Sequence, residues 1–253
     1  MALTAEQVEG FLSDGFIKLE GAFPREVGEQ CRDQLWSASG CDPNDRASWI
    51  EPVIRLGGLA TPPFQQAATT PALHEAFDQL AGPGSWIPRI GLGTFPLRFP
   101  SKAEPGDDGW HVDASYARPQ GEPRLNLRSR HRALLMLFLF SEVGPDDAPT
   151  RIRIGSHLDV PVLLKPGGEA GREWMALCTE AVPASAHRPE ALATSRLGDV
   201  YLCHPFLVHA AQPHHGCTPR FMAQPPLYAS TPLDLDDNHP APVARAVRTG
   251  LTN

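Results

Sequence analysis

The chain has 253 residues, of which 42% are hydrophobic and 20% charged, a composition typical of a globular domain that excludes a disordered or collagen-like chain. The net charge of −7 argues against a nucleic-acid partner. The longest apolar run, residues 133–140, is far shorter than the roughly 20 residues of a bilayer-spanning helix, so no membrane partner is expected. The amino-terminal segment lacks signal-peptide features, and we predict a cytoplasmic protein whose five cysteines are reduced.

Helices dominate the predicted amino-terminal third. Residues 4–14 begin with a capping box and continue with apolar residues at helical spacing, and Gly15 is a stop signal. Residues 16–20 alternate like a strand. A proline opens each of two further predicted helices, over about 24–36 and 71–81, because its fixed φ suits the first helical position.

The character of the sequence changes at about Ser85, where short β-like runs separated by Pro and Gly begin. This pattern is typical of a sandwich or a barrel. We predict a single domain over residues 1–253. It comprises a helical and strand region at 1–84, a β-rich body at 85–230 and a carboxyl-terminal tail at 231–253.

Two helices are expected among these strands, one near residues 169–178 and a short one near 243–249. The run 133–140 is apolar throughout and predicts a central strand buried on both faces. The acidic stretch 234–240 indicates a solvated connection. The predicted strands are 85–95, 132–141, 150–155, 199–203, 206–211 and 220–229.

Two histidine–aspartate pairs are candidate metal ligands. His111 and Asp113 are two residues apart, as are His157 and Asp159, and such residues face the same side of an extended backbone. A second histidine from a remote strand would complete a set of two nitrogens and one oxygen. That set leaves coordination positions open and suits non-haem Fe(II) oxygenases. Either tripeptide alone is weak evidence, so the choice between the pairs stays open here.

His209 is the candidate for the remote ligand. It lies in the predicted strand 206–211, and a turn-rich link leads from it to Arg220, so the two residues should face each other across a hairpin. The planar guanidinium of arginine can pair a carboxylate through two hydrogen bonds. A co-substrate that chelates an open iron and also carries a distant carboxylate is 2-oxoglutarate. Arg220 is therefore the predicted clamp for that carboxylate.

The other histidines of this region are expected to have different roles. His204 is five residues from His209, which places it on the opposite face of a regular strand. His214 and His215 lie in the predicted turn, and adjacent residues of an extended chain point to opposite sides. We therefore expect both of them at the surface.

These residues resemble the phytanoyl-CoA dioxygenase-like family of Fe(II)/2-oxoglutarate-dependent oxygenases, and the resemblance covers most of the chain. It implies a mainly β fold with flanking helices, namely a double-stranded β-helix or cupin-like jelly roll. It also implies that His111, Asp113 and His209 are the metal ligands and the catalytic centre, because the Gly-Ser-His segment of the family binds no metal. The matching segments are 3–36, His111 with Asp113, Thr150, Gly155 to His157, and Gly198-Asp199 leading to His209 and Arg220.

The resemblance implies an enzyme that uses O2 and 2-oxoglutarate to oxidise a small organic molecule, a role compatible with natural-product biosynthesis. Hydroxylation is the default outcome, and desaturation, cyclisation or epimerisation are alternatives. The presence of Asp113 disfavours halogenation, since related halogenases lack this ligand. Ala211 stands where the family commonly has a hydroxyl residue that holds the co-substrate, so Thr94 or Arg98 would supply this contact instead.

Trp110 and Tyr116 flank the metal pair and are candidates to line the substrate pocket. The arginine-rich stretch 118–132 is either a solvated face or a lid that recognises an anionic substrate. Two other functions stay open. Ala211 motivates a non-catalytic jelly-roll protein that binds a small molecule, and a cupin-like metalloenzyme could use another metal, such as zinc for hydrolysis.

Overall fold

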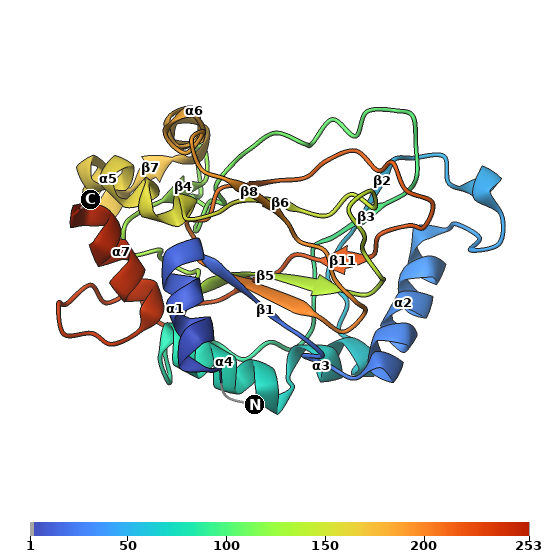
Figure 1. Cartoon of the computed structure of the whole chain (residues 1–253), viewed down its shortest axis with the longest axis horizontal. Helices are drawn as coiled ribbons and strands as arrows, with labels where there is room; N and C mark the ends of the chain where they lie inside the picture. The colour runs from blue at the N-terminus through green and yellow to red at the C-terminus, as the bar shows by residue number, and fades with distance from the viewer. Residues whose placement is uncertain (1–2, 253) are drawn as a thin grey trace.

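The computed structural model describes residues 3–252, which form antiparallel β-structure flanked by helices (Figure 1). The larger sheet has the order β1 (Phe16–Leu19), β9 (Val200–Cys203), β5 (Leu134–Leu139) and β11 (Met222–Ala223), and β12 (Pro226–Leu227) also pairs with β5. A second sheet has the order β10 (His209–Ala210), β6 (Arg151–Arg153) and β8 (Glu190–Leu192). Two ribbons pair β2 (Val53–Leu56) with β3 (Phe95–Arg98), and β4 (Arg124–Leu125) with β7 (Arg172–Glu173).

The helices surround this β-structure, with α3 and α4 below the larger sheet and α5, α6 and α7 at one end in the view of Figure 1. Within residues 3–252, no helix has the length and apolar character needed to cross a membrane. The α-helices are α1 (Ala5–Asp14), α2 (Arg25–Ser39), α3 (Pro62–Ala68), α4 (Pro71–Ala81), α5 (Val160–Leu164), α6 (Trp174–Ala184) and α7 (Pro242–Thr252). Short 3-10 helices cover Arg46–Ser48, Ser156–Leu158 and Lys165–Ala170.

The first helix has the predicted signals at both ends. The Thr4 hydroxyl accepts a hydrogen bond from the Gln7 backbone N–H, and the Gln7 side chain accepts one from the Thr4 N–H. Gly15 ends α1 with a φ of 85°, a left-handed conformation that favours glycine. A Cβ atom at Gly15 would also lie 2.5 Å from Nδ1 of His157, so close packing excludes a side chain there.

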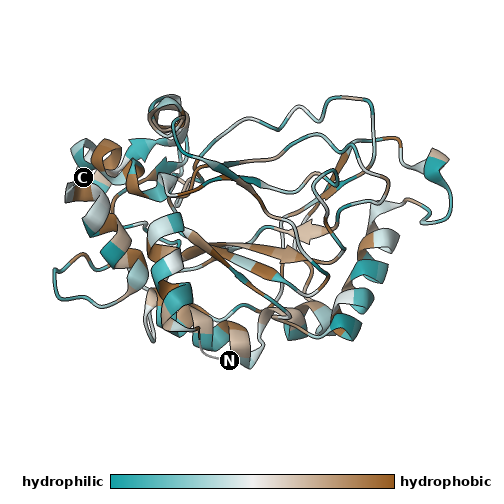
Figure 2. Cartoon of the chain, in the orientation of Figure 1, coloured by the Kyte–Doolittle hydropathy of each residue, from teal (hydrophilic) through white to brown (hydrophobic). Residues whose placement is uncertain are grey.

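The β5 strand is the centre of the core and is buried on both faces, as predicted. Its even-numbered side chains, together with Phe140 just after the strand, pack in one cluster with apolar residues of α1 to α4. Its odd-numbered side chains pack with Ile152 of β6 and Met222 of β11. The apolar colour of the central strands in Figure 2 reflects this arrangement. One apolar strand therefore joins the helical layer to the second sheet.

Several predicted elements differ from the structure. The strand predicted at 85–95 was wrong, because this Pro- and Gly-rich segment forms bends with isolated β-bridges at Trp86 and Leu92, and the strand β3 begins only at Phe95. The helix predicted at 169–178 is α6, which starts at Trp174, because residues 165–170 form a separate 3-10 helix with a kink at Gly168. The second helix begins at Arg25, with Pro24 as its cap, and continues to Ser39.

The carboxyl-terminal region contains a longer helix than the sequence indicated. The helix predicted near 243–249 is α7, whose residues Val243, Ala244 and Val247 are buried against α1, α4 and α5. The acidic connection 234–240 is mostly exposed, as predicted. The predicted tail, residues 231–253, therefore contains a helix that packs against the rest of the molecule. Only the connection before α7 is solvated.

The Gly155-Ser156-His157 turn links the two layers. The Ser156 hydroxyl accepts a hydrogen bond from the Val208 N–H at 2.9 Å, just before His209. Nε2 of the buried His157 donates to the Leu12 carbonyl oxygen at 3.2 Å. Asp159 forms an ion pair with Arg188 at 2.6 Å. The second histidine–aspartate pair is thus structural, in agreement with its expected exclusion from the metal site.

Because His157 is buried, the fold should lose stability in mild acid. Burial lowers the pKa of His157 to about 4, whereas histidine in the unfolded chain titrates near 6.5. The unfolded state therefore binds more protons between these values, and the stability contribution of neutral His157 is lost as the pH falls from 6.5 towards 4. We expect the free energy of unfolding to decrease by about 2 kcal/mol between pH 7 and pH 5 through this residue.

Urea denaturation at the two pH values measures this effect. The variant His157→Gln, which keeps a side-chain donor for Leu12, should show a weaker pH dependence than the wild type. His187→Gln, at an exposed histidine, should not differ from the wild type. If His157→Gln had the same pH dependence as the wild type, His157 would not be the residue that causes the loss of stability in mild acid.

Candidate metal centre

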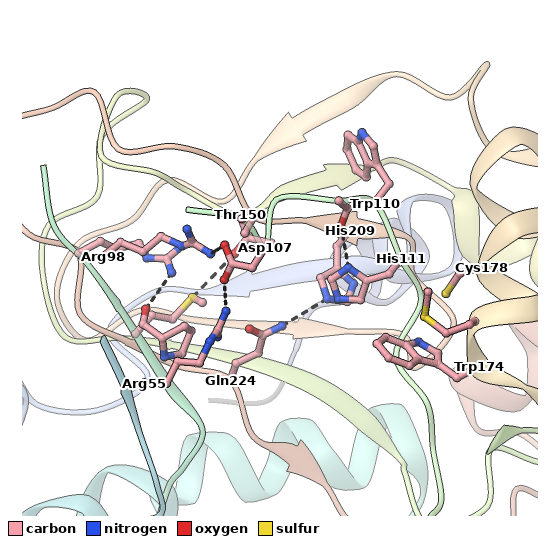
Figure 3. A pocket seen from close by; sticks show the side chains of 17 residues that line it. Arg55, Arg98, Asp107, Trp110, His111, Thr150, Trp174, Cys178, His209 and Gln224 are labelled. Carbon is pink, nitrogen blue, oxygen red and sulfur yellow. Dashed lines mark hydrogen bonds and ion pairs between the residues drawn. The ribbon is translucent and has the colours of Figure 1, made fainter. Parts of the chain in front are cut away.

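A backbone pairing brings two histidines from remote parts of the chain together. The His111 N–H donates to the His209 carbonyl at 3.0 Å, and the His209 N–H donates to the His111 carbonyl at 2.9 Å. The two imidazole centroids are 4.4 Å apart (Figure 3). Asp113 follows on the same segment, with Oδ1 3.8 Å from Nε2 of His111. One nitrogen or oxygen atom from each of the three side chains lies within 4.8 Å of the others.

Backbone carbonyls set the orientation of both rings. Nδ1 of His111 lies 2.9 Å from the Gly109 carbonyl, and Nδ1 of His209 lies 3.0 Å from the Leu207 carbonyl. A carbonyl only accepts, so each Nδ1 carries a proton and each Nε2 offers its lone pair. Burial, followed by the nearby His111, lowers the pKa of His209 to about 4, which keeps this ring neutral at physiological pH. Two neutral imidazoles and a carboxylate fit a divalent transition metal.

Arg132 fixes the carboxylate of this group. Its guanidinium donates to Oδ2 of Asp113 at 2.7 Å, which leaves Oδ1 towards the histidines. Burial opposes ionisation of Asp113, but the positive charge of Arg132 and the proximity of the two histidines hold the pKa of Asp113 below its ordinary value. The carboxylate is therefore ionised and oriented before any ligand binds.

Loss of the Arg132 contact should weaken metal binding. In Arg132→Met the carboxylate loses its only side-chain hydrogen bond among the described residues, and we expect Fe(II) affinity to fall about 10- to 100-fold, as for other partners of metal ligands. Anaerobic calorimetric titration measures this affinity. Arg132→Lys should restore part of it, and Arg130→Met, at an exposed arginine over Tyr116, should leave it unchanged. Equal affinity in Arg132→Met and the wild type would exclude this positioning role.

The three side chains lie beside a cavity of about 510 Å³. Both sheets and the β2–β3 ribbon contribute to its wall, and so does the amino-terminal turn of α6. Its volume is in the range of small-molecule sites. Its lining consists of Arg55, Pro96, Arg98, Gly106, Asp107, Gly109, Trp110, His111, Thr150, Trp174, Met175, Cys178, His209, Ala211, Arg220, Met222 and Gln224.

Two buried arginines form one end of the cavity. Arg98 and Arg220 are 2% and 1% exposed and are paired through their backbones. The guanidinium of Arg220 donates to the carbonyls of Ala148 and Pro96, and its Nε has no partner. Nε of Arg98 is likewise unpartnered. Burial and the neighbouring Arg98 lower the pKa of Arg220 to about 9. Buried unpaired donors with excess positive charge fit a carboxylate.

One acidic residue partly compensates this charge. Asp107 accepts a hydrogen bond from Arg98 at 2.6 Å and also pairs with Arg55 at the rim. Burial opposes ionisation of Asp107, but the two arginines hold its pKa below the ordinary value. Three cations and one anion leave this end of the cavity positively charged.

The hairpin expected between His209 and Arg220 was wrong. β10 belongs to the smaller sheet, where His209 is paired with Ile152, whereas β11 belongs to the larger sheet. The chain crosses between the sheets after Ala210, and Arg220 pairs with Arg98. Both residues nevertheless line the same cavity, because the two sheets meet there.

Only some of the remaining predicted site residues line the cavity. Arg98 and Trp110 line the cavity, and so does Ala211, whereas Thr94 and Tyr116 are not part of the lining. The Thr94 carbonyl accepts from the Gln224 N–H, and the Tyr116 hydroxyl donates to the Ala170 carbonyl. These contacts involve the backbone of Thr94 and the hydroxyl group of Tyr116, and neither residue lines the cavity.

Two expectations about the other basic residues need correction. His214 is buried, at 5% exposure, where a surface position was expected, because its Nε2 pairs with the Thr218 carbonyl inside the turn. His215 is exposed, as predicted, and His204 is buried in the core. The arginine-rich stretch is not uniform, because Arg124 lies in β4 and Arg132 reaches Asp113.

Sequence reasoning missed three residues of this site. Gln224 places its side-chain nitrogen 3.3 Å from Nε2 of His209. Trp174 donates from its indole nitrogen to the carbonyl of Val112, between the two ligands His111 and Asp113. Asp107 forms ion pairs with Arg55 and Arg98 at the arginine end of the cavity. No local spacing signals these contacts, since each joins distant segments.

No family model matches the chain, and no curated protein matches its sequence. Solved structures do match. HygX from Streptomyces hygroscopicus, with nickel and 2-oxoglutarate bound, has 19% identity and a TM-score of 0.56 over 88% of this chain and 86% of that one. SnoK, a non-haem α-ketoglutarate-dependent carbocyclase from nogalamycin biosynthesis, has 17% identity and a TM-score of 0.58 over 94% and 89%.

A third match is EctD from S. alaskensis in its apoform, with 19% identity and a TM-score of 0.61 over 92% of this chain and 79% of that one. This chain has the fold of these enzymes. At these identities the similarity concerns the β-rich architecture with its helices and assigns no role to the side chains of the site.

Proposed function

We propose that this chain is an Fe(II)/2-oxoglutarate-dependent dioxygenase that hydroxylates a small organic molecule with O2. One observation carries the proposal: His111 and His209, which meet Asp113, line a cavity whose other end holds the buried pair Arg98 and Arg220. Metal ligands and buried cations beside one cavity suit a co-substrate with a chelating keto acid at one end and a carboxylate at the other.

The donor set fits ferrous iron. His111 and His209 would each supply Nε2 and Asp113 would supply Oδ1, which leaves coordination positions for other ligands. When bound, iron and 2-oxoglutarate supply the oxidising power, with O2 as oxidant and succinate and CO2 as by-products. The chain holds its imidazoles in the Nε2-donating tautomer through Gly109 and Leu207, and Arg132 keeps the carboxylate ionised.

Arg220 would hold the distal carboxylate of 2-oxoglutarate. Its unpartnered Nε and its burial support this role, because a buried donor without an acceptor is costly unless a ligand supplies one. Arg98 would add a second cation in place of the hydroxyl group that Ala211 lacks. Among the described residues that line the cavity, Thr150 has a hydroxyl group, but this hydroxyl faces the sulfur of Met222.

Three finer features belong to the same proposal. The two sheets would form the double-stranded β-helix, or jelly roll, and the chain would be a member of the phytanoyl-CoA dioxygenase-like family. It would act in the cytoplasm, in the biosynthesis of a natural product. The similarity to HygX and SnoK supports the choice of co-substrate. The HygX structure contains 2-oxoglutarate, and SnoK is described as α-ketoglutarate-dependent.

Product analysis tests the proposal. Purified protein with Fe(II), 2-oxoglutarate and O2 should release succinate, and a true substrate should raise the rate and gain one oxygen atom from ¹⁸O2. Omission of Fe(II) or substitution of zinc should abolish succinate release. Succinate release that never exceeds the protein-free control would contradict the proposal and favour a binding protein. Hydrolysis that depends on zinc would favour the alternative metalloenzyme.

A further inference from the structure

The charged side chains of the cavity lie on one side of the histidine pair. Arg55, Arg98 and Asp107 lie on this side in Figure 3, and Arg220 adjoins Arg98 through their backbone pairing. Nε2 of His209 and the side chain of Gln224 lie between this group and the opposite side. If 2-oxoglutarate occupies the cationic side, the substrate must occupy the other.

Aromatic side chains form that opposite side. Trp110 and Trp174 lie there on either side of the histidines, and Cys178 lies beyond them (Figure 3). The ring of Trp174 meets His111 edge to face, with centroids 6.3 Å apart and an interplanar angle of 87°. Met175, which follows Trp174, is 51% exposed at the mouth of the cavity.

Both indoles are held in place by the protein itself. The indole nitrogen of Trp174 donates to the Val112 carbonyl. The guanidinium carbons of Arg151 and Arg153 lie 4.8 and 4.4 Å from the ring centroid of Trp110. Because these side chains are ordered before binding, they lose little conformational entropy when a ligand binds. Rigid aromatic walls favour a partner that can stack on them.

The aromatic side offers little to a charged or highly hydroxylated ligand. Arg151 and Arg153, whose guanidinium groups lie over Trp110, are not part of the lining and donate to the Ala211, Asp108 and Val182 carbonyls. No charged side chain other than the metal ligands lines this side among the described residues of the cavity. A charged group placed here would lose its hydration without gaining a partner.

We propose that the reacting part of the substrate is a neutral, flat ring system, aromatic or conjugated, that stacks against Trp110 and Trp174. This inference rests on the proposed function for the placement of 2-oxoglutarate, and it adds the chemical class of the substrate. The exposed thioether of Met175 at the mouth adapts to substituents that extend outward.

Binding of three matched probes tests the inference. 2-Naphthol is neutral and flat, decahydro-2-naphthol has the same carbon skeleton without the flat rings, and 2-naphthoate carries a charge. Calorimetry is done on the metal-free protein and on the anaerobic complex with Fe(II) and 2-oxoglutarate. Because both indoles are fixed without metal, we expect 2-naphthol to bind both forms about tenfold more tightly than either other probe.

Variants test whether 2-naphthol binds against the indole ring of Trp110. Trp110→Ala should weaken 2-naphthol binding about tenfold, and Trp110→Phe should retain most of it. Tyr228→Ala, at an exposed aromatic residue outside the cavity, should leave it unchanged. Preference for 2-naphthoate or decahydro-2-naphthol, or full affinity in Trp110→Ala, would overturn the inference. If 2-naphthol binds the metal-free protein but Fe(II) and 2-oxoglutarate do not bind, the proposed function is contradicted, whereas the proposed binding of a flat ring to Trp110 and Trp174 is supported.

Discussion

Replacement of Asp113 by alanine should reduce Fe(II) affinity by at least about 100-fold. The substitution removes the only carboxylate of the ligand group, and it leaves the guanidinium of Arg132 unpaired beside the metal, where it repels a cation. Both effects lower the affinity for Fe(II). Anaerobic titration with Fe(II), followed by metal analysis after gel filtration, measures the loss.

The chain supplies a matched control for this variant. Asp159 has the same spacing to His157 as Asp113 has to His111, but it pairs with Arg188 away from the cavity. Asp159→Ala should keep the Fe(II) affinity of the wild type and lose only stability. Full iron occupancy in Asp113→Ala, or equal loss in both variants, would contradict the choice of ligand pair.

Replacement of Arg220 by glutamine should raise the dissociation constant of 2-oxoglutarate about 100-fold, because a desolvated charged hydrogen bond is lost. Fe(II) affinity should change little, since Arg220 is not one of the three ligands. Anaerobic calorimetric titration with Fe(II), followed by titration of the Fe(II) protein with 2-oxoglutarate, measures both affinities.

Arg55→Gln is the control for the arginine end of the cavity. Arg55 is exposed at the rim, with 53% of its side chain accessible, so its removal should weaken 2-oxoglutarate binding only a few-fold. Circular dichroism must show that Arg220→Gln is folded. A folded Arg220→Gln protein that binds 2-oxoglutarate as tightly as the wild type would exclude Arg220 as the clamp.

Local signals predicted those parts of the fold that depend on neighbours in the chain. The capping box at Thr4 and the stop at Gly15 define α1, because both signals act within one helical turn. The apolar run of β5 indicated burial on both faces because no polar residue interrupts it. The spacing of His111 and Asp113 indicated that they face one side, and the structure brings His209 to them.

Features set by contacts between distant segments could not be predicted in this way. The partner of Asp113 is Arg132, 19 residues away, within a stretch in which five arginines look alike. The crossing of the chain between the sheets after β10 has no local signal, because the intervening turn is also compatible with a hairpin. Strand 85–95 was overpredicted because its apolar residues alternate with turn formers, and backbone pairing begins only at Phe95.

The most direct test is an anaerobic titration of the wild-type protein with Fe(II) and then with 2-oxoglutarate, followed by visible absorption. We predict one iron per chain and a charge-transfer band that appears only when both are present, as chelation of ferrous iron by the keto acid requires. Binding of iron without the band, or a band that persists in Asp113→Ala, would contradict a centre formed by the two histidines and this aspartate.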